Sequence, residues 1–279
     1  MIALATCAEL PTGYLEDALA ERLGARWAVW DDPAVDWAAF DAVIVRSTWD
    51  YQRDLAGFLA WAHSVGTLRN PATVLAWNTD KRYLADVAAA GLPVVATTFL
   101  APGQALPAAL PDELVLKPAV SAGSRDTGRF RPDTEPDAVA ALLAAIHASG
   151  RTAMLQPFVG AVDTHGETAL LYAGGRFSHA IRKDAILRPG TVAALGTAED
   201  PAIEPRDPAP AERALADRTV AWLQERLGPL AYARIDLLAG PDGAPVILEL
   251  ELSEPCLYLP FAEGAAERFA AAFRAAAQG

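Results

Sequence analysis

Two apolar segments near the C-terminal end constrain the fold more than any other feature of the sequence. Residues 231–238 and 245–252 each carry a run of strand-forming side chains, and Gly240-Pro-Asp-Gly243 stands between them. Glycine and proline at this spacing favour a tight turn, so the two segments are predicted to pair as an antiparallel hairpin. The C-terminal part of the chain therefore needs a sheet, against which neighbouring helices can pack.

This hairpin carries carboxylates on one face. Glu249 and Glu251 are two residues apart, so their side chains leave the same face of the strand. If the turn closes as a two-residue loop, Asp236 lies opposite Ile247, on that same face and diagonal to Glu249. Close carboxylates repel unless a cation lies among them, and oxygen ligands are those that Mg²⁺ prefers. The alternative, a half-exposed strand with its polar face in water, stays open on the pattern alone.

Strands and helices alternate through the rest of the chain. Periodicity predicts strands at 2–6, 27–30, 42–46, 113–117, 153–158, 167–173 and 176–182, and helices at 14–23, 55–65, 81–90, 137–149, 211–227 and 262–277. Asn70-Pro71 marks a turn, and residues 71–77 are predicted to be a link. The polar stretch 183–210 is rich in proline and glycine, which predicts a long functional loop.

Composition excludes several classes of function. The chain has 35 acidic and 23 basic residues, a net charge of −12, and no basic run. We therefore expect no nucleic-acid partner and no binding to anionic membranes. The two cysteines, Cys7 and Cys256, are too few for a disulfide framework or a four-ligand metal site, which fits a cytoplasmic protein. The N-terminus lacks the positive region of a signal peptide, and proline and glycine break the longest uncharged stretch, 87–111, so no membrane segment is expected.

Lysine is rare in this chain. Only three basic residues are lysines, Lys81, Lys117 and Lys183, and the others are arginines. A chain that prefers arginine for surface charge keeps lysine where a compact ammonium group is needed. Lys81 begins a predicted helix, where its charge opposes the helix dipole and a bound phosphate would resolve the conflict. A solvated lysine at a helix start is the plain alternative.

The residues after Lys117 form a loop rich in glycine and serine. Ser121, Gly123 and Ser124 follow the strand that ends in Lys117, so their backbone N–H groups could be brought against an anion. Most such loops are simple turns, and the order differs from that of a P-loop. The loop is a candidate for anion binding because Lys117 stands directly before it.

A second group of cations ends the strand 176–182. His179, Arg182 and Lys183 stand there, just before the long loop, and could neutralise a transferring phosphoryl group. A strand end that faces water is the alternative. The four histidines show no metal-ligand spacing, and no nucleophile motif is present.

Taken in order, these pieces resemble the ATP-grasp superfamily, of the type represented by glutathione synthetase and ribosomal-protein glutamate ligase. The resemblance covers essentially the whole chain and implies an α/β (α+β) fold of three lobes. These are an N-terminal α/β substrate lobe (1–75), a small central lid lobe (76–153) and a C-terminal catalytic lobe with an antiparallel sheet (154–279). It also implies ATP and Mg²⁺ as cofactors, with two ions bound and Mn²⁺ able to substitute.

The resemblance assigns roles by position. ATP phosphates would be held by Lys81 and Lys117, with the lid loop Ser121, Gly123 and Ser124. Adenine would bind at Leu155, Gln156, Phe158 and Val159, and the ribose at Asp163 or Glu167. Metal ligands would be Asp236, Glu249 and Glu251, the last of which is more often asparagine in the family. Arg182, Lys183 and Arg234 would act on the phosphates and the acyl intermediate.

Two strings, VRSTWDY at 45–51 and FSHAIRK at 177–183, further resemble the cyclo-ligases of D-cycloserine biosynthesis, which close O-ureido-D-serine. This implies a small, amino-acid-like substrate. Its carboxylate and amine would be bound by Arg46, Thr48, Trp49, Asp50 and Tyr51, with backbone donors near Ser253. A strand-end loop anchored by a tryptophan is the alternative for the first string.

The expected activity is a ligase reaction through an acyl phosphate, in which a nitrogen nucleophile displaces phosphate. The loop 183–210 would be a lid that keeps water out, and the chain would form a dimer or tetramer. Three alternatives remain: a non-catalytic ATP-binding regulatory module of the synapsin kind, a kinase that stops at phosphoryl transfer, and an intermolecular ligase of the glutathione-synthetase type.

Overall fold

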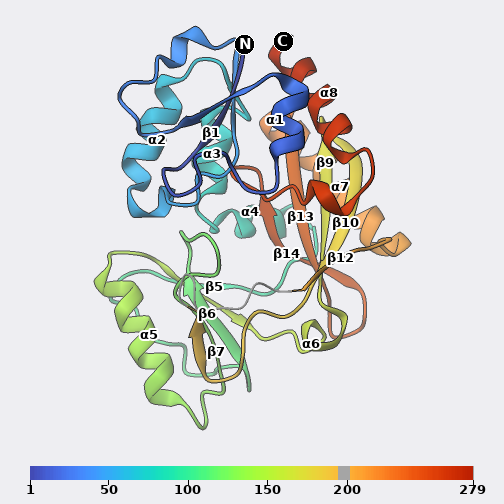
Figure 1. Cartoon of the computed structure of the whole chain (residues 1–279). Helices are drawn as coiled ribbons and strands as arrows, with labels where there is room; N and C mark the ends of the chain where they lie inside the picture. The colour runs from blue at the N-terminus through green and yellow to red at the C-terminus, as the bar shows by residue number, and fades with distance from the viewer. Residues whose placement is uncertain (194–201, 279) are drawn as a thin grey trace.

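The computed structural model describes residues 1–193 and 202–278, whose strands form three sheets (Figure 1). The first sheet is parallel, in the order β2-β1-β3-β4. Its strands are β1 (Ile2–Thr6), β2 (Arg26–Val29), β3 (Ala42–Val45) and β4 (Leu68–Arg69). β1 and β3 are buried along their whole length, as expected for parallel strands covered on both faces.

The helices of this lobe are α1 (Asp17–Leu23), α2 (Leu55–Ser64) and α3 (Ala72–Asn78), with short 3₁₀ turns η1 (Trp37–Ala39) and η2 (Tyr51–Arg53). The predicted link at 71–77 is wrong, because α3 occupies it. Pro71 precedes the helix and does not interrupt it, since a helix start needs no N–H at that point. Val74 and Leu75 are fully buried, so packing outweighs the Asn-Pro turn signal.

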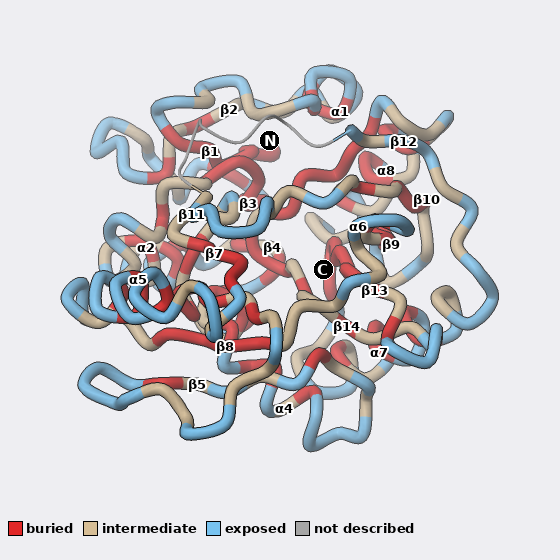
Figure 2. Tube along the Cα trace, turned by 90° about the horizontal axis from the view of Figure 1, so that it is seen from below, coloured by how far each residue is buried: buried red, intermediate tan, exposed pale blue. Residues whose placement is uncertain are grey.

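The second sheet is antiparallel, in the order β11-β7-β6-β8-β5. Its strands are β5 (Thr98–Leu100), β6 (Leu114–Pro118), β7 (Thr127–Phe130), β8 (Ala153–Pro157) and β11 (Thr191–Ala193). Helix α5 (Pro136–Ala148) lays its apolar stripe on this sheet and encloses a separate small core. Figure 2 shows the outer turns of α5 exposed and the strands β7 and β8 buried.

The third sheet is also antiparallel, in the order β12-β10-β9-β13-β14. Its strands are β9 (Glu167–Ala173), β10 (Arg176–Lys183), β12 (Ile203–Pro205), β13 (Tyr232–Ala239) and β14 (Pro245–Glu251). Alternate residues of β9 face opposite sides: Leu170 packs with helix α7 (Pro210–Leu227), and Leu171 packs with helix α8 (Ala265–Gln278). The remaining elements are α4 (Tyr83–Ala89), α6 (Val162–His165) and η3 (Leu259–Phe261).

The first and third sheets share one core. Leu4 of β1 and Ile44 of β3 lie in the same buried cluster as Leu171 of β9 and Phe269 of α8. The second sheet has its own cluster, so it forms a distinct layer beside this common body. The mixed α/β fold with a C-terminal antiparallel sheet, predicted from the sequence, is confirmed.

The segment after β10 crosses between two sheets. β11 pairs with β7 of the second sheet, whereas β12 pairs with β10 of the third. The sequence predicts one long loop here, and these two short strands were missed. The rest of that loop, 194–201, lies outside the described residues.

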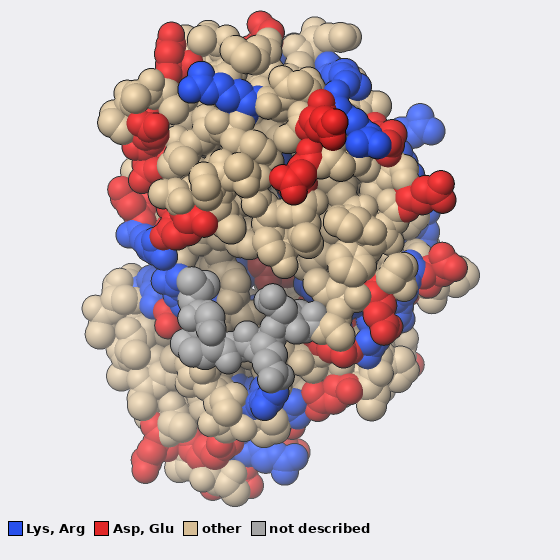
Figure 3. Space-filling model, in the orientation of Figure 1, with Lys and Arg blue, Asp and Glu red and all other residues tan. Residues whose placement is uncertain are grey.

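Charges of both signs are spread over the face shown in Figure 3, with no large basic patch on it. In the described part of the chain, no helix is both long and apolar enough to span a membrane.

Candidate active site

The hairpin β13–β14 aligns acids and bases across two neighbouring strands. Asp236 pairs with Glu249, and Arg234 pairs with Glu251. Directly opposite residues share a face, so these four side chains meet on one side of the sheet. The predicted register is wrong: a bulge follows Asp236, and Leu237, not Asp236, lies opposite Ile247. The turn is one residue longer than predicted, since Gly240 N donates to Ala244 O at 2.7 Å, and the bulge adds a second residue on β14; together they place Asp236 directly across from Glu249 instead of diagonal to it.

The outer edge of β14 is fixed by side chains from helices. β14 is the last strand of its sheet, so the backbone groups on its free edge need other partners. Tyr83 Oη donates to Leu250 O at 2.9 Å and accepts from Leu250 N at 2.8 Å. Asn78 Nδ2 donates to the same carbonyl at 2.8 Å, and Asn78 Oδ1 accepts from Leu252 N at 2.7 Å. The strand that carries Glu249 and Glu251 is therefore held in place.

Asp236 is the most strongly neutralised acid. Arg234 Nε and Nη2 each donate to a different oxygen of Asp236 at 2.8 Å, and Lys183 Nζ lies 3.1 Å from the second oxygen. Burial opposes ionisation, but Arg234 and Lys183 outweigh it and hold the pKa of Asp236 below its ordinary value.

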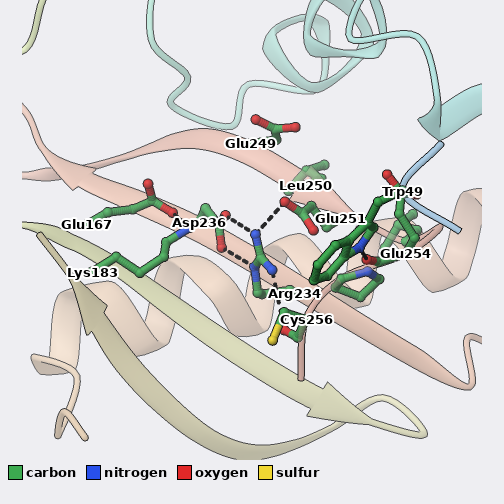
Figure 4. A network of polar contacts seen from close by, with 12 residues as sticks. Trp49, Glu167, Lys183, Arg234, Asp236, Glu249, Leu250, Glu251, Glu254 and Cys256 are labelled. Atoms are coloured by element: carbon green, nitrogen blue, oxygen red, sulfur yellow. Dashed lines mark hydrogen bonds and ion pairs between the residues drawn. The ribbon is translucent and has the colours of Figure 1, made fainter. Parts of the chain in front are cut away.

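Two further acids share the same bases. Glu251 contacts Arg234 Nη2, and Glu167 of β9 pairs with Lys183 (Figure 4). Burial is the largest effect on both, and it raises the pKa of Glu251 and raises that of Glu167 to about 8. Neighbouring acids with pKa values driven apart are typical of catalytic sites.

Glu249 receives two lysines from other parts of the chain. Lys81 Nζ lies 3.0 Å from one oxygen and Lys117 Nζ lies 3.8 Å from the other. Despite burial, these ammonium groups lower the pKa of Glu249. Burial lowers the pKa of Lys117 itself. The chain thus brings its three lysines together around the acids of the third sheet.

We call these eight ion-paired residues the charged network: Lys81, Lys117, Glu167, Lys183, Arg234, Asp236, Glu249 and Glu251.

Lys81 does not lie in a helix. α4 begins at Tyr83, so Lys81 stands in the turn before it, and the predicted conflict with a helix dipole does not arise. Its backbone N–H donates to Ala119 O at 2.8 Å, and its ammonium group donates to Ser121 O at 2.8 Å. Glu249 and Ser121 together direct this side chain.

The predicted lid loop reaches the first lobe. Ser121 O also accepts from Tyr51 Oη at 3.4 Å. Gly123 has φ 63° and Ser124 has φ 55°, so the loop turns through the left-handed region at both residues. Only the glycine adopts this conformation without strain.

The four residues predicted at the adenine occupy β8 and the turn after it. Leu155 is buried in the core of the second sheet. Gln156 Nε2 donates to Thr97 Oγ1 at 2.9 Å. Phe158 N donates to Glu113 O at 2.8 Å, and Val159 O accepts from Val162 N at 3.0 Å.

Of the two acids predicted at the ribose, only Glu167 belongs to the charged network. Asp163 accepts two hydrogen bonds from Arg129, each at 2.9 Å, and the Arg129 guanidinium lies 3.5 Å over the Phe158 ring. Arg129 thus links Asp163 to Phe158, one of the residues predicted at the adenine.

Arg182 and Lys183 point to opposite faces of β10, as neighbours in a strand must. Lys183 enters the charged network, whereas Arg182 donates to His165 O at 3.0 Å and pairs with Asp184. This placement does not support the predicted action of Arg182 on a phosphoryl group.

Arg46 is enclosed. Its guanidinium is bound by both oxygens of Glu16 and by Pro255 O, and it lies 4.9 Å over the Tyr232 ring. The Arg46 side chain is 0% exposed. The prediction that Arg46 binds a substrate carboxylate is therefore wrong, because the buried carboxylate of Glu16, which the prediction overlooked, already takes that place.

The other residues predicted to bind the substrate have different surroundings. Trp49 Nε1 donates to Glu254 O at 3.0 Å, and Asp50 accepts from Trp30 Nε1 at 2.9 Å. Thr48 is fully buried, and its Oγ1 has no partner among the described residues.

Ser253 is buried, and its hydroxyl lies 3.3 Å from Asn78 Oδ1. Its neighbour Glu254 was missed by sequence reasoning, although it is the third acid of ELELSEP. Burial and then Glu251 raise the pKa of Glu254 to about 8.

Comparison with known proteins decides the family. A family model described as the N-terminal domain of the D-cycloserine synthetase DcsG matches residues 2–73. The cycloserine biosynthesis protein DcsG of Streptomyces lavendulae is 41% identical over 262 residues, which cover 87% of this chain and 85% of that protein. This chain belongs to the DcsG family of ATP-grasp ligases.

The crystal structure of D-cycloserine synthetase DcsG matches with a TM-score of 0.88 at 38% identity, over 99% of both chains. An ATP-grasp RimK domain protein from Sphaerobacter thermophilus matches with a TM-score of 0.66 at 20% identity, over 100% of both chains, which shows the shared fold. The predicted ATP-grasp resemblance is thereby confirmed, and the chain is an ATP-dependent ligase.

Proposed function

We propose that this ligase activates the carboxylate of an amino-acid-like substrate as an acyl phosphate and closes it on a nitrogen of the same molecule. The substrate we propose is O-ureido-D-serine: its O-linked nitrogen attacks the acyl phosphate and expels phosphate, and water then removes the carbamoyl group as CO2 and ammonia to leave D-cycloserine. The similarity to DcsG over most of the chain supports this choice. The observation that carries the chemistry is the β13–β14 register, which sets Asp236 across from Glu249 among three lysines.

The donor set fits Mg²⁺. Asp236, Glu249 and Glu251 supply carboxylate oxygens from two adjacent strands, and hard oxygen ligands suit this ion. We propose that these residues hold two ions, with Mn²⁺ able to substitute. When bound, the ions would offset negative charge on the phosphates.

The remaining assignments follow the placement of each residue. Lys81, Lys117 and Lys183 bring ammonium groups that can bind phosphate oxygens. We propose that the loop 121–124 covers the phosphates and that Leu155, Gln156, Phe158 and Val159 border the adenine. Glu167 or Asp163 would contact the ribose. We propose that Arg234, whose N–H groups lie beside the acids, stabilises the oxyanion of the tetrahedral intermediate.

The substrate would lie between the charged network and the first lobe. Trp49 and Tyr51 contact residues on either side of that space, Glu254 and Ser121. Thr48, Asp50 and Ser253 would complete this wall. We propose that the segment 183–210 excludes water from the acyl phosphate, which water would otherwise hydrolyse.

The test is ADP formation with O-ureido-D-serine, with D-cycloserine identified by mass. Glu249→Gln should lower turnover by about 100-fold or more, because a carboxylate at the centre of the charged network is lost. Glu225→Gln, an exposed change on α7, is the matched control and should leave turnover unchanged. Wild-type turnover in Glu249→Gln would remove the metal assignment.

Hydroxylamine separates the alternatives. A trapped hydroxamate shows an activated carboxylate and supports a ligase, whereas ADP without hydroxamate or ring product indicates a kinase. No ADP with any amino acid tested would favour a regulatory module. ADP that forms only when a second amine is added would favour intermolecular ligation.

We also propose a cytoplasmic location, a dimer or tetramer, and lobes bounded at 1–75, 76–153 and 154–279. Sedimentation at several concentrations tests the oligomeric state.

A further inference from the structure

The backbone between β14 and η3 is held by a row of side chains. Each of the five carbonyl groups of residues 253–257 has a side-chain partner from elsewhere in the chain. In order, these partners are Tyr232 Oη at 2.8 Å, Trp49 Nε1 at 3.0 Å, Arg46 Nη2, Arg234 Nη1 at 3.3 Å and His179 Nε2 at 3.0 Å.

These partners belong to two lobes. Trp49 and Arg46 follow β3 of the first sheet, while Tyr232, Arg234 and His179 lie on strands of the third sheet. In this segment outside regular structure every carbonyl group of residues 253–257 is thus hydrogen-bonded, as it would be in a sheet. The direction in which Glu254 leaves this segment is therefore fixed by the fold.

Charge balance singles out the Glu254 carboxylate. The charged network holds four bases and four acids, and every acid in it has an ion-pair partner. Glu254 adds a further acid beside them. Its backbone oxygen is bonded to Trp49, but its carboxylate contacts no base among residues 1–193 and 202–278.

The neighbours of Glu254 explain why the pKa of its carboxyl group is raised. Burial and Glu251 are the two largest reasons for its raised pKa, and Lys81 only partly opposes them. In Figure 4 the labelled residues run from Glu167 and Lys183, through Arg234, to Trp49 and Glu254 at the other side. Glu254 thus closes the end of the site that faces the first lobe.

We propose that Glu254 binds the ammonium group of the amino-acid-like substrate, a role that rests on the proposed function. A partly buried carboxylate without a base needs a cation from outside the chain. The adjacent Trp49 is paired with Tyr14 at a ring-centroid distance of 5.3 Å, and aromatic faces favour an organic cation over a strongly hydrated metal ion.

This contact has a chemical consequence. An ammonium group held by Glu254 stays protonated and has no lone pair, so it is excluded as the nucleophile. The substrate carboxylate would then lie towards Arg234 and the lysines, and the ureido nitrogen that is bonded to oxygen would remain free to attack the activated carbonyl. Glu254 would therefore orient the substrate and keep its amine from attacking a second activated molecule, without itself transferring a proton.

The first experiment measures kcat and KM for O-ureido-D-serine in Glu254→Gln. We expect KM to rise about 10- to 100-fold, the size of one lost charge-assisted hydrogen bond, with KM for ATP unchanged. Glu254→Asp should recover part of the loss, and Glu225→Gln should behave as wild type. A shifted Mg²⁺ dependence in Glu254→Gln, with KM for the substrate unchanged, would mark Glu254 as a metal ligand and overturn the proposal.

The second experiment needs no turnover. Binding of D-serine and of D-glycerate, which has a hydroxyl in place of the amine, is measured by calorimetry with a non-hydrolysable ATP analogue and Mg²⁺. Wild type should prefer D-serine, and Glu254→Gln should lose the preference. The proposal is overturned if wild type shows no preference or binds neither compound, or if the variant keeps the preference.

The two experiments separate the two claims. A preference for D-serine that depends on Glu254, without cyclisation of O-ureido-D-serine, leaves the ammonium site standing and removes the proposed substrate. Cyclisation of O-ureido-D-serine, with kcat and KM unchanged in Glu254→Gln, supports the proposed substrate and removes the ammonium site. Because glutamine has nearly the same shape as glutamate and no base that the structure describes loses an ion-pair partner, the thermal unfolding midpoint of Glu254→Gln should not fall, and this measurement verifies that the variant folds.

Discussion

Two buried arginines in this molecule bind carboxylates in similar ways and serve different ends. Arg46 binds both oxygens of Glu16, and Arg234 binds both oxygens of Asp236. Arg46 and Glu16 form a closed pair, 0% and 2% exposed, with a carbonyl completing the set. Arg234 is shared between Asp236 and Glu251, and Lys183 between Asp236 and Glu167, so none of these three acids has a base to itself.

The difference lies in how completely each charge is matched. A one-to-one buried pair with satisfied hydrogen bonds has nothing left to offer a ligand, and it fixes the contact between two lobes. A shared set leaves some acids under-neutralised, as the raised pKa of Glu251 shows. Such a set can exchange its internal partners for a metal ion or a phosphate. A buried charged side chain is therefore not by itself evidence of a functional site. Acids that share their bases, and so are incompletely neutralised, do identify one.

The largest effect, on turnover, should come from replacing Lys183, with the replacement of its neighbour Arg182 as the comparison. Lys183→Met should lower turnover by about 100-fold or more, because Glu167 and Asp236 both lose an ammonium group. Arg182→Met removes only a partly exposed contact and should lower turnover less than about fivefold. Equal losses in ADP formation, with both variants folded by circular dichroism, would contradict the division of β10 into two faces.

A smaller effect, on stability, should distinguish the closed pair. Arg46→Met should lower the free energy of unfolding by about 3–5 kcal/mol, because Glu16 is left buried and unpaired. Adding Glu16→Leu should recover most of this loss in urea unfolding, and with it the turnover. The corresponding double change at the other arginine, Arg234→Met with Asp236→Leu, should recover neither stability nor turnover, because Glu251 also loses its ion-pair partner. If the Arg46→Met/Glu16→Leu variant is stable but inactive, the result would instead support Arg46 as a substrate-binding residue.

The smallest effect concerns the bond that links the two regions. Trp49→Phe removes the N–H that holds Glu254 O and should cost about 1 kcal/mol of stability. It should also raise KM for the substrate a few-fold, since Glu254 is less firmly placed. Trp222→Phe on α7 is the control: it can alter stability but should leave KM unchanged. Identical KM values in the two variants would show that this bond does not position Glu254.

Local chemistry made much of the molecule predictable. The turn at Gly240–Gly243 and the alternation of Glu249 and Glu251 follow from the residues themselves, and both appear in the structure. The rarity of lysine was informative, because all three lysines pair with acids of the charged network.

What failed depended on contacts between distant parts of the chain. The bulge after Asp236 adds one residue that no periodicity reveals. Arg46 looked available because Glu16 is 30 positions away, and only folding brings the pair together. Helix α3 and the strands β11 and β12 are stabilised by tertiary partners, which outweigh local turn signals.

The core common to the first and third sheets joins the first lobe to the sheet that carries the acids. The second sheet lies outside this common core. Because Leu4 and Phe269 pack together, the first lobe and the acids of β13 and β14 must move as one rigid piece. The second sheet carries Lys117 and has most of its apolar side chains in a cluster of its own. Opening it would draw Lys117 away from Glu249 while leaving Glu254 and Trp49 in register, so an amino acid could be seated before the phosphate end is assembled.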